Sequence, residues 1–204
     1  IIKERDVLLF FPYHSYHYIL NLLREASIDP NVESIKITLY RLASNSVMAN
    51  ALINAIKNGK SVTVVVELQA RFDEEANIYW ANQLQDEGAT VIFGVPGLKV
   101  HSKLFLITRK ESGTICRYAH IGTGNFNEET ALVYSDISLL TADERITEEV
   151  EKLFNFYSNN YKIGHYKHLL VAPWDMRKRY VNYINKEIAS AREGKEAYIW
   201  LKLN

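Results

Sequence analysis

Cysteine occurs only once in the 204 residues, at Cys116. A single cysteine excludes an intrachain disulfide and a cysteine-rich zinc site, and it is typical of proteins of the reducing cytoplasm, where we expect this one. Net charge is also missing, since 24 Lys and Arg residues balance 24 Asp and Glu residues. This balance excludes the overall basic field that drives non-specific nucleic-acid binding. Any anion site therefore has to be local, and we expect no nucleic-acid partner.

Long apolar runs are absent as well. No stretch approaches the ~18 apolar residues of a membrane-spanning helix, and we expect neither a membrane span nor a signal peptide. The first residue is Ile1 rather than Met, from which we expect the chain to be cut from a longer protein. Its 204 residues fit one full domain and part of a second, at ~100–200 residues per domain.

Apolar runs and amphipathic segments alternate along most of the chain, which predicts strands that alternate with helices. The predicted strands are 6–11, 35–40, 62–68, 91–93, 98–107, 114–121 and 134–141. The predicted helices follow residue 15, cover 46–58 and 73–87, or begin at 143 or 147 and reach about 157. Such an order is typical of β-α-β units. We expect an α/β fold whose mixed, mainly parallel sheet is flanked by helices on both faces.

Chemistry-bearing residues gather in the segment 98–107. Alternation of polar and apolar residues predicts that His101 and Lys103 project from the same face of a strand. An imidazole nitrogen can attack phosphorus and carry a phosphoryl group covalently, and a lysine ammonium neutralises the oxygens on which charge develops. We therefore expect His101 as nucleophile and Lys103 as a stabiliser of the transferring group.

The strand that follows leads into Gly122-Thr123-Gly124-Asn125. This glycine-rich exit is expected to bring the Asn125 side chain and backbone N–H groups beside the His-Lys pair, as a third catalytic contribution. His120, just before it, is interpreted as a core histidine. Arg41 and Arg71 each follow a predicted parallel strand, at the edge where open α/β sheets bind ligands, and their guanidinium groups suit phosphate oxygens.

The order H-x-K and then G-[ST]-x-N resembles the phospholipase-D-like superfamily, whose members work through a covalent histidine intermediate. One position departs from that pattern, because Thr108 stands where the superfamily usually has an acidic residue. Superfamily sites are usually completed by two halves that each bring a histidine, and this chain holds one half.

Longer segments narrow the resemblance to the polyphosphate kinase family, which departs from the superfamily at the position of Thr108 too. The segments that carry it are, in order, Thr38-Leu39-Tyr40-Arg41, Glu67 to Ile78 (ELQARFDEEANI), Gly97 to Lys103 (GLKVHSK) and His120 to Asn127 (HIGTGNFN). The resemblance implies a phospholipase-D-like fold. It covers essentially the whole chain.

The resemblance also implies roles for single residues. His101 matches the histidine that ATP phosphorylates and that passes the phosphoryl group reversibly to inorganic polyphosphate. Tyr134 matches a nucleotide-binding position, and Arg41 and Arg71 match positions where the family's magnesium site is placed. A guanidinium has no lone pair to give a cation, so we expect these arginines to bind the phosphates that hold Mg²⁺.

The end of the chain repeats the order of its beginning. A predicted strand at 168–173, a helix at 176–192 and a strand at 198–203 parallel the elements of residues 6–40. We therefore expect a polyphosphate kinase domain at 1–163 and the truncated start of a second phospholipase-D-like domain at 164–204. The isolated fragment is expected to be inactive, and the full-length protein to be a homo-oligomer.

Two other functions stay open at this point. One is a phospholipase-D-like phosphodiesterase or nuclease that is completed by dimerisation. The other is a non-catalytic polyphosphate-binding module, since the second histidine of a complete site is not in this chain.

Overall fold

A computed structural model describes residues 1–43, 45–67, 74–161 and 163–201. The chain divides into two compact units, Ile1–Gly164 and His165–Asn204. The first unit is built on the strands β1 (Val7–Phe11), β2 (Val32–Leu39), β3 (Ser61–Val66), β4 (Thr90–Phe93), β5 (Lys103–Glu111), β6 (Thr114–Gly122) and β7 (Asp136–Thr141). Its helices are α1 (His17–Ile28), α2 (Val47–Lys57), α3 (Glu74–Asp86), the 3-10 turn η1 (Thr130–Leu132) and α4 (Glu144–Ser158).

The seven strands form one mixed sheet in the order β1-β7-β6-β5-β2-β3-β4. The expected mixed α/β sheet is thus confirmed, but the expectation that it is mainly parallel is wrong. Only β2 with β3 and β3 with β4 pair in parallel among the described strands, whereas β2/β5, β5/β6, β6/β7 and β1/β7 are antiparallel. The reason lies in the connections, because β5 and β6 are joined by a tight turn at Ser112 and Gly113 that forces an antiparallel pair.

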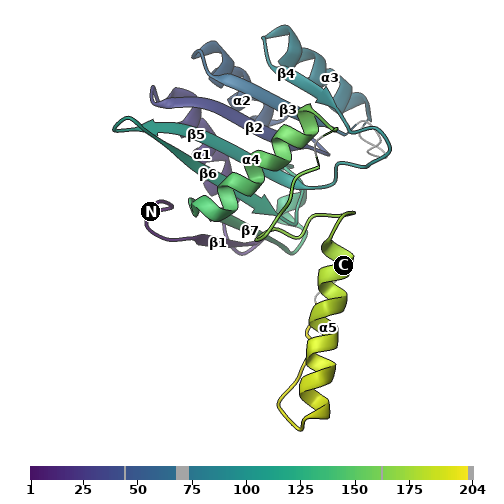
Figure 1. The fold of residues 1–204 in the computed structure, drawn as a ribbon. Helices are drawn as coiled ribbons and strands as arrows, with labels where there is room; N and C mark the ends of the chain where they lie inside the picture. The colour runs from purple at the N-terminus through teal and green to yellow at the C-terminus, as the bar shows by residue number, and fades with distance from the viewer. Residues whose placement is uncertain (44, 68–73, 162, 202–204) are drawn as a thin grey trace. The chain divides into compact units, whose positions relative to one another are not determined.

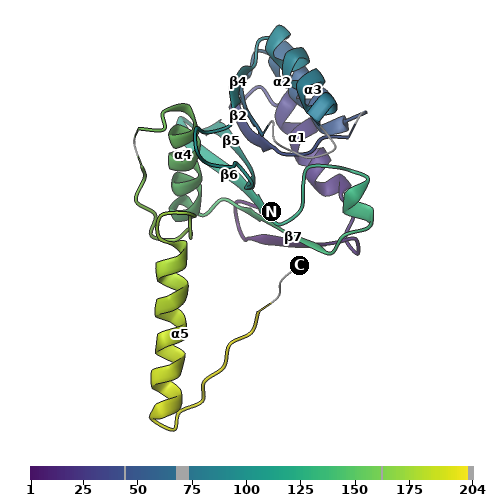
Figure 2. The same ribbon diagram turned by 90° about the vertical axis from the view of Figure 1, so that its right-hand side faces the viewer.

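Helices cover both faces of this sheet, as expected. Helices α1, α2 and α3 lie on one face and α4 lies on the other (Figures 1 and 2). The central strand β5 is consequently buried on both sides. Phe105 and Ile107 join the main core with α1 and α2, while Leu104 and Leu106, which alternate with them, lie on the face that α4 covers.

The ends of several strands meet at one edge of the sheet. Because β5 runs antiparallel to β2 and β6, its first residue, Lys103, lies near the last residues of β2 and directly opposite Gly122 at the end of β6. Strand β7 begins at the same edge, with Ser138 opposite Gly122. Loops that are far apart in the sequence are thereby brought together at this edge, which we call the near end of β5.

The second unit contains one helix, α5 (Met176–Arg192), which has no buried residue among its described positions. The Arg179 guanidinium ties the preceding turn to this helix by donating to the carbonyl oxygens of Tyr166, Lys167 and Leu169. The helix was predicted at the same residues, but the described residues 165–201 contain no strand, so the strands expected at 168–173 and 198–203 are not formed there. Two strands alone are marginal, since a stable sheet needs more neighbours.

Within the described residues no helix combines the length and the apolar composition that crossing a bilayer requires.

Candidate active site at the near end of β5

His101 lies in the loop that precedes β5, and its side chain is exposed. The prediction that His101 and Lys103 share one face of a strand is therefore wrong, because β5 starts only at Lys103, which is buried. The strand cannot begin earlier because side chains of other elements take the backbone groups around His101. The N–H of Val100 donates to Glu67 Oε2 (2.9 Å), and the carbonyl of Ser102 accepts from Thr38 Oγ1 (2.7 Å).

The loop is held at a third point by α4, through the hydroxyl groups of Ser102 and Tyr157, whose oxygens are 2.9 Å apart. Thr38 Oγ1 also accepts from the N–H of Leu104 at 3.0 Å. The partners of the loop are Thr38 in β2, Tyr157 in α4 and Glu67, which follows β3 directly. The position of the His101 backbone is therefore set by β2, β3 and α4 together.

Cations surround the His101 imidazole. Partial burial is the main cause that lowers the pKa of His101, and the charges of Lys103, Lys99 and Arg41 lower it further, while Glu67 acts in the opposite direction. A lowered pKa keeps the imidazole neutral at neutral pH, with a lone pair available. The His101 imidazole thus lies in a field that attracts anions, and its role as nucleophile stays a prediction.

Lys103 is a buried charged residue, with only 5% of its surface exposed. Burial lowers its pKa to about 8, an effect that Asp136 opposes and Arg41 reinforces. Its Nζ donates to the carbonyl oxygen of His101 at 2.5 Å, so the ammonium lies beside the histidine loop. Lys103 forms no ion pair in the part of the chain that the structure describes.

The Gly122–Asn125 loop follows β6 as predicted, and the register of β5 and β6 places Gly122 opposite Lys103. Its glycines are required for packing. A Cβ on Gly122 would come within 2.7 Å of the His120 ring, and a Cβ on Gly124 would come within 2.4 Å of the Asp136 carboxylate. Thr123 Oγ1 donates to Asp136 Oδ1 at 2.8 Å and so holds that carboxylate against the loop.

Asn125 ends this loop. Its Oδ1 is buried and has no hydrogen-bond partner within the described ranges. A buried amide group without a partner costs free energy unless a ligand or water meets it. That the side chain and the loop N–H groups face a phosphate stays a prediction.

Arg41 lies at the near end, two residues beyond the end of β2, close enough that its charge affects both His101 and Lys103. The buried Asn77 of α3 fixes the backbone on either side of it, since its Nδ2 donates to the carbonyl of Tyr40 (2.8 Å) and its Oδ1 accepts from the N–H of Leu42 (3.3 Å). Arg71 lies outside the described residues.

Tyr134 follows η1 and precedes β7, which begins at the near end. Its side chain is 61% exposed, and the neighbouring Leu132 and Val133 are exposed as well. The Tyr134 ring therefore presents an accessible aromatic surface.

His120 is a core residue, as predicted. Its ring stacks on Phe105 and contacts Phe126, both at 4.9 Å between centroids, and its Nε2 lies 2.9 Å from Ser138 Oγ. Complete burial lowers its pKa to about 3, so the ring is neutral. The His120 ring packs beside Gly122, at the start of the glycine loop, and fills the space that a side chain there would need.

The residues at the near end do not fit a magnesium ion held by protein ligands alone. No three His, Cys, Asp or Glu side chains gather into a metal-binding group in the described residues. Arg41 has no lone pair to offer to a cation, and a contact of Arg41 with the phosphates that hold Mg²⁺ stays a prediction. A cation that arrives with phosphate oxygens as its main ligands is compatible with this donor set.

Several residues that shape the near end were not predicted from the sequence: Thr38, Tyr40, Glu67, Asn77, Asp136 and Tyr157. The contacts of Thr38, Glu67 and Tyr157 with the histidine loop and of Asn77 with Tyr40 join positions 33 to 66 residues apart, and Asp136 contacts Thr123, 13 residues away. One local signal was available, because Glu67 places a carboxylate directly after the apolar run of β3.

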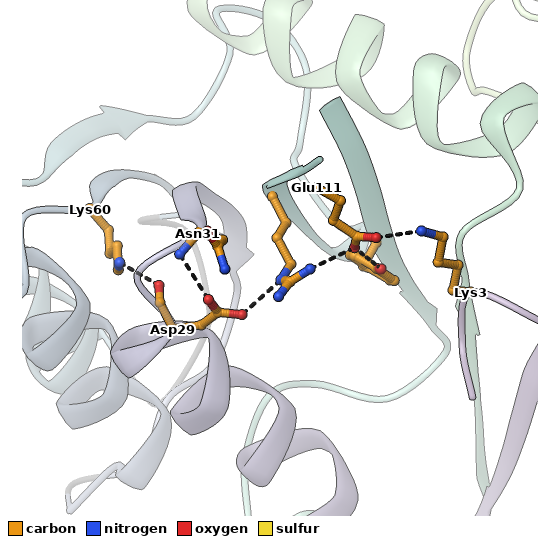
Figure 3. Close-up of polar contacts among 7 residues, drawn as sticks. Lys3, Asp29, Asn31, Lys60 and Glu111 are labelled. Carbon is orange, nitrogen blue, oxygen red and sulfur yellow. Dashed lines mark hydrogen bonds and ion pairs between the residues drawn. The ribbon is translucent and has the colours of Figure 1, made fainter. Parts of the chain in front are cut away.

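A second polar cluster lies at the other end of β5, which we call the far end. Glu111 accepts from Lys3 Nζ and the Tyr118 hydroxyl, and pairs with Arg109 Nη1 at 3.0 Å. Arg109 Nε also donates to Asp29 Oδ2 at 2.7 Å, so one chain of contacts runs from Lys3 to Asp29 (Figure 3). A cavity of about 890 Å³ borders this cluster, but every cation drawn there already has an oxygen partner.

Comparison with known proteins places these observations in a family. Residues 1–163 match the family model described as polyphosphate kinase C-terminal domain 1. The polyphosphate kinase of Klebsiella pneumoniae is 58% identical over 203 residues, which are 100% of this chain and 30% of that protein. The chain thus spans less than a third of the length of this relative.

Solved structures agree. The crystal structure of polyphosphate kinase from Porphyromonas gingivalis superposes with a TM-score of 0.85 at 40% identity, over 96% of this chain and 33% of that one. Nuc of Salmonella typhimurium, a phospholipase D family member, superposes with a TM-score of 0.57 at 16% identity, over 77% of this chain and 93% of that one. The second likeness shows that the fold is phospholipase-D-like.

Proposed function

Because the chain belongs to the polyphosphate kinase family, we propose that it carries the phosphoryl-transfer site of a polyphosphate kinase, with His101 as the residue that is transiently phosphorylated. The proposed substrates are ATP and ADP on one side and inorganic polyphosphate on the other. The observation that carries the proposal is the exposed His101 imidazole among the cations Lys99, Lys103 and Arg41.

In the first step a ring nitrogen of His101 attacks the γ-phosphorus of ATP. A P–N bond forms while the bond from that phosphorus to the β,γ-bridging oxygen breaks, and ADP leaves with the electron pair. Charge on the transferring oxygens is neutralised by Lys103, with the Asn125 amide as a further donor. The buried ammonium acts strongly because few water molecules screen it.

In the second step a terminal oxygen of polyphosphate attacks the phosphohistidine. A P–O bond forms as the P–N bond breaks, the neutral imidazole is restored, and the polyphosphate is one unit longer. Both steps run in reverse when ADP is the acceptor. Arg41 is proposed to hold phosphate oxygens in both steps, since a guanidinium offers two parallel donors to one phosphate.

Three further roles are proposed with this reaction. Mg²⁺ would be held mainly by the phosphate oxygens that Arg41 is proposed to bind, and it would spread the charge of those phosphates. The exposed ring of Tyr134 stacks with the nucleotide base, and Arg71 joins Arg41 on the phosphates. The cytoplasmic location, the homo-oligomeric assembly and the inactivity of the isolated chain stay predictions.

The test is a labelling assay on the full-length enzyme with γ-labelled ATP and Mg²⁺, followed by peptide mapping. We expect an acid-labile, alkali-stable label on the His101 peptide, complete loss of it in His101→Ala, and normal labelling in the control His17→Gln, whose exposed side chain lies on α1. An enzyme that turns over without label on His101 would refute the proposal. Polyphosphate binding without any turnover would identify a binding module instead.

A further inference from the structure

Three side chains of the near end meet at the ring of Tyr40, the residue directly after β2. The His101 imidazole meets this ring edge to face, with 4.7 Å between centroids and 81° between the planes. Lys103 Nζ lies over the ring, 4.8 Å from its centroid, and Lys99 Nζ lies 5.7 Å from it. One aromatic side chain thus contacts the proposed nucleophile and both neighbouring lysines.

The Tyr40 backbone is fixed from two directions. Its carbonyl oxygen accepts from Asn77 Nδ2 at 2.8 Å. Two residues earlier, Thr38 uses one hydroxyl to bind the carbonyl of Ser102 and the N–H of Leu104, on either side of Lys103. The Tyr40 ring and the histidine loop are therefore both attached to β2, which fixes the distance between them.

The contacts are of two kinds, and both favour one arrangement. The face of an aromatic ring carries negative potential and attracts an ammonium, while its edge is positive and suits an edge-to-face neighbour. The ring therefore offsets part of the cost of burying the Lys103 ammonium. It also restricts the rotation of the His101 ring, which the loop backbone does not do.

From this geometry we propose that Tyr40 is a positioning residue: its ring orients the His101 imidazole and holds the Lys103 ammonium beside it, so that both meet the same phosphoryl group. The inference rests on the proposed function for its reaction, but the contact itself is independent of it. The contacts that carry this role, with His101 and both lysines, are made by the ring of Tyr40.

The kinetic test compares Tyr40→Leu with Tyr40→Phe in the full-length enzyme. Tyr40→Leu removes the ring, and we expect the single-turnover rate of label transfer to His101 to fall roughly 10- to 100-fold, with KM for ATP changed less than about 3-fold. Tyr40→Phe keeps the ring and is expected to stay within about 3-fold of the unsubstituted enzyme. Tyr18→Leu, an exposed tyrosine on α1, is the control.

The structural test needs no activity. In proton NMR spectra of the 204-residue chain, the imidazole C–H signals of His101, identified by their absence in His101→Gln, are expected to carry a ring-current shift. Tyr40→Phe should keep this shift and Tyr40→Leu should abolish it. Unchanged His101 signals in Tyr40→Leu, or an unchanged labelling rate, would overturn the inference. Absence of label on His101 in the unsubstituted enzyme would overturn the proposed function instead, even where the NMR result holds.

Discussion

Both ends of β5 carry basic side chains, but the two ends differ in whether those side chains form ion pairs. At the far end, Arg109 and Lys3 each contact a carboxylate, and Glu111 is bound from three sides, which lowers its pKa to about 2. At the near end, Lys99 and Lys103 form no ion pair among the described residues, and Lys103 is buried all the same. The same strand therefore has ion-paired cations at one end and, at the other, two lysines without an ion pair among the described residues.

This difference indicates that the far end of β5 stabilises the fold, whereas the near end is suited to bind an anion. A cation that already has a carboxylate gains little from an external anion, so the far end is a structural cluster although it borders a cavity. A buried ammonium without a carboxylate costs stability in the free protein, and a bound phosphate removes that cost. The backbone of the near end is nevertheless well satisfied, through Thr38 and Glu67.

The sharpest test of this contrast is Lys103→Met, which replaces the buried ammonium by a neutral chain of similar size. We expect phosphoryl transfer to His101 in the full-length enzyme to fall about 100- to 1000-fold, because the group that neutralises the transferring oxygens is lost. The free energy of unfolding of the 204-residue chain should rise by about 2 kcal/mol. The cost of burying the ammonium, which its lowered pKa reflects, is removed, and the lost contact with the Tyr40 ring offsets part of this gain. Label transfer and urea denaturation measure the two effects.

The sign follows from the pKa of Lys103, which is lowered from 10.5 to about 8 in the folded protein. Below pH 8 the lysine is charged in both states and its burial costs stability, and this cost vanishes as the pH rises from about 8 to 10.5. The advantage of Lys103→Met should therefore shrink over that range. Lys110→Met, an exposed site on the same strand, should change neither quantity appreciably, and a destabilised Lys103→Met would contradict the contrast.

The second test is Glu111→Gln at the far end, with the opposite outcome. Loss of the charged partner of Lys3, Arg109 and Tyr118 should lower the free energy of unfolding by about 1 to 2 kcal/mol at pH 7, measured by urea denaturation. Label transfer to His101 in the full-length enzyme should stay within about 2-fold. Glu33→Gln, an exposed site on the adjacent β2, is the matched control.

The effect of Glu111→Gln should depend on pH. The Lys3 contact is the main cause that lowers the pKa of Glu111 from 4.5 to about 2, so its stabilisation is fully present above pH 4.5 and is lost as the pH falls toward 2. Unfolding curves of the two proteins should therefore converge in acid. A difference that persists at pH 2 would show that packing, and not charge, is responsible.

The positions of the residues at the near end were largely predictable because each lies next to the end of a strand. Arg41 after β2, His101 before β5 and Gly122–Asn125 after β6 lie where short-range patterns put them. The contacts that hold them were not predictable, because they depend on the register between strands. Thr38 reaches Ser102 only because β2 and β5 are antiparallel neighbours, and no pairing of these two strands was predicted from the sequence.

The far end could not be predicted for the same reason. Lys3 and Glu111 are 108 positions apart, and nothing in the local sequence of either points to the other. Their contact arises from the order of the strands in the sheet. Strand β1, which follows Lys3, joins the sheet through β7, while β5 and β6 turn back at residues 111–114. Charge pairs of this kind follow from the fold and do not help to predict it.

The mildest test is Arg109→Lys, which keeps the positive charge at the far end and removes the planar guanidinium group. Arg109 uses Nε for Asp29 and Nη1 for Glu111, whereas the single ammonium of a lysine reaches one of the two. We expect the urea midpoint to fall by less than half the shift of Glu111→Gln, since Lys3 still binds Glu111, and we expect 1 M NaCl to reduce the difference by screening. Arg117→Lys on β6 is the matched control. A loss larger than that of Glu111→Gln would mean that Asp29, and not Glu111, is the centre of the far-end cluster.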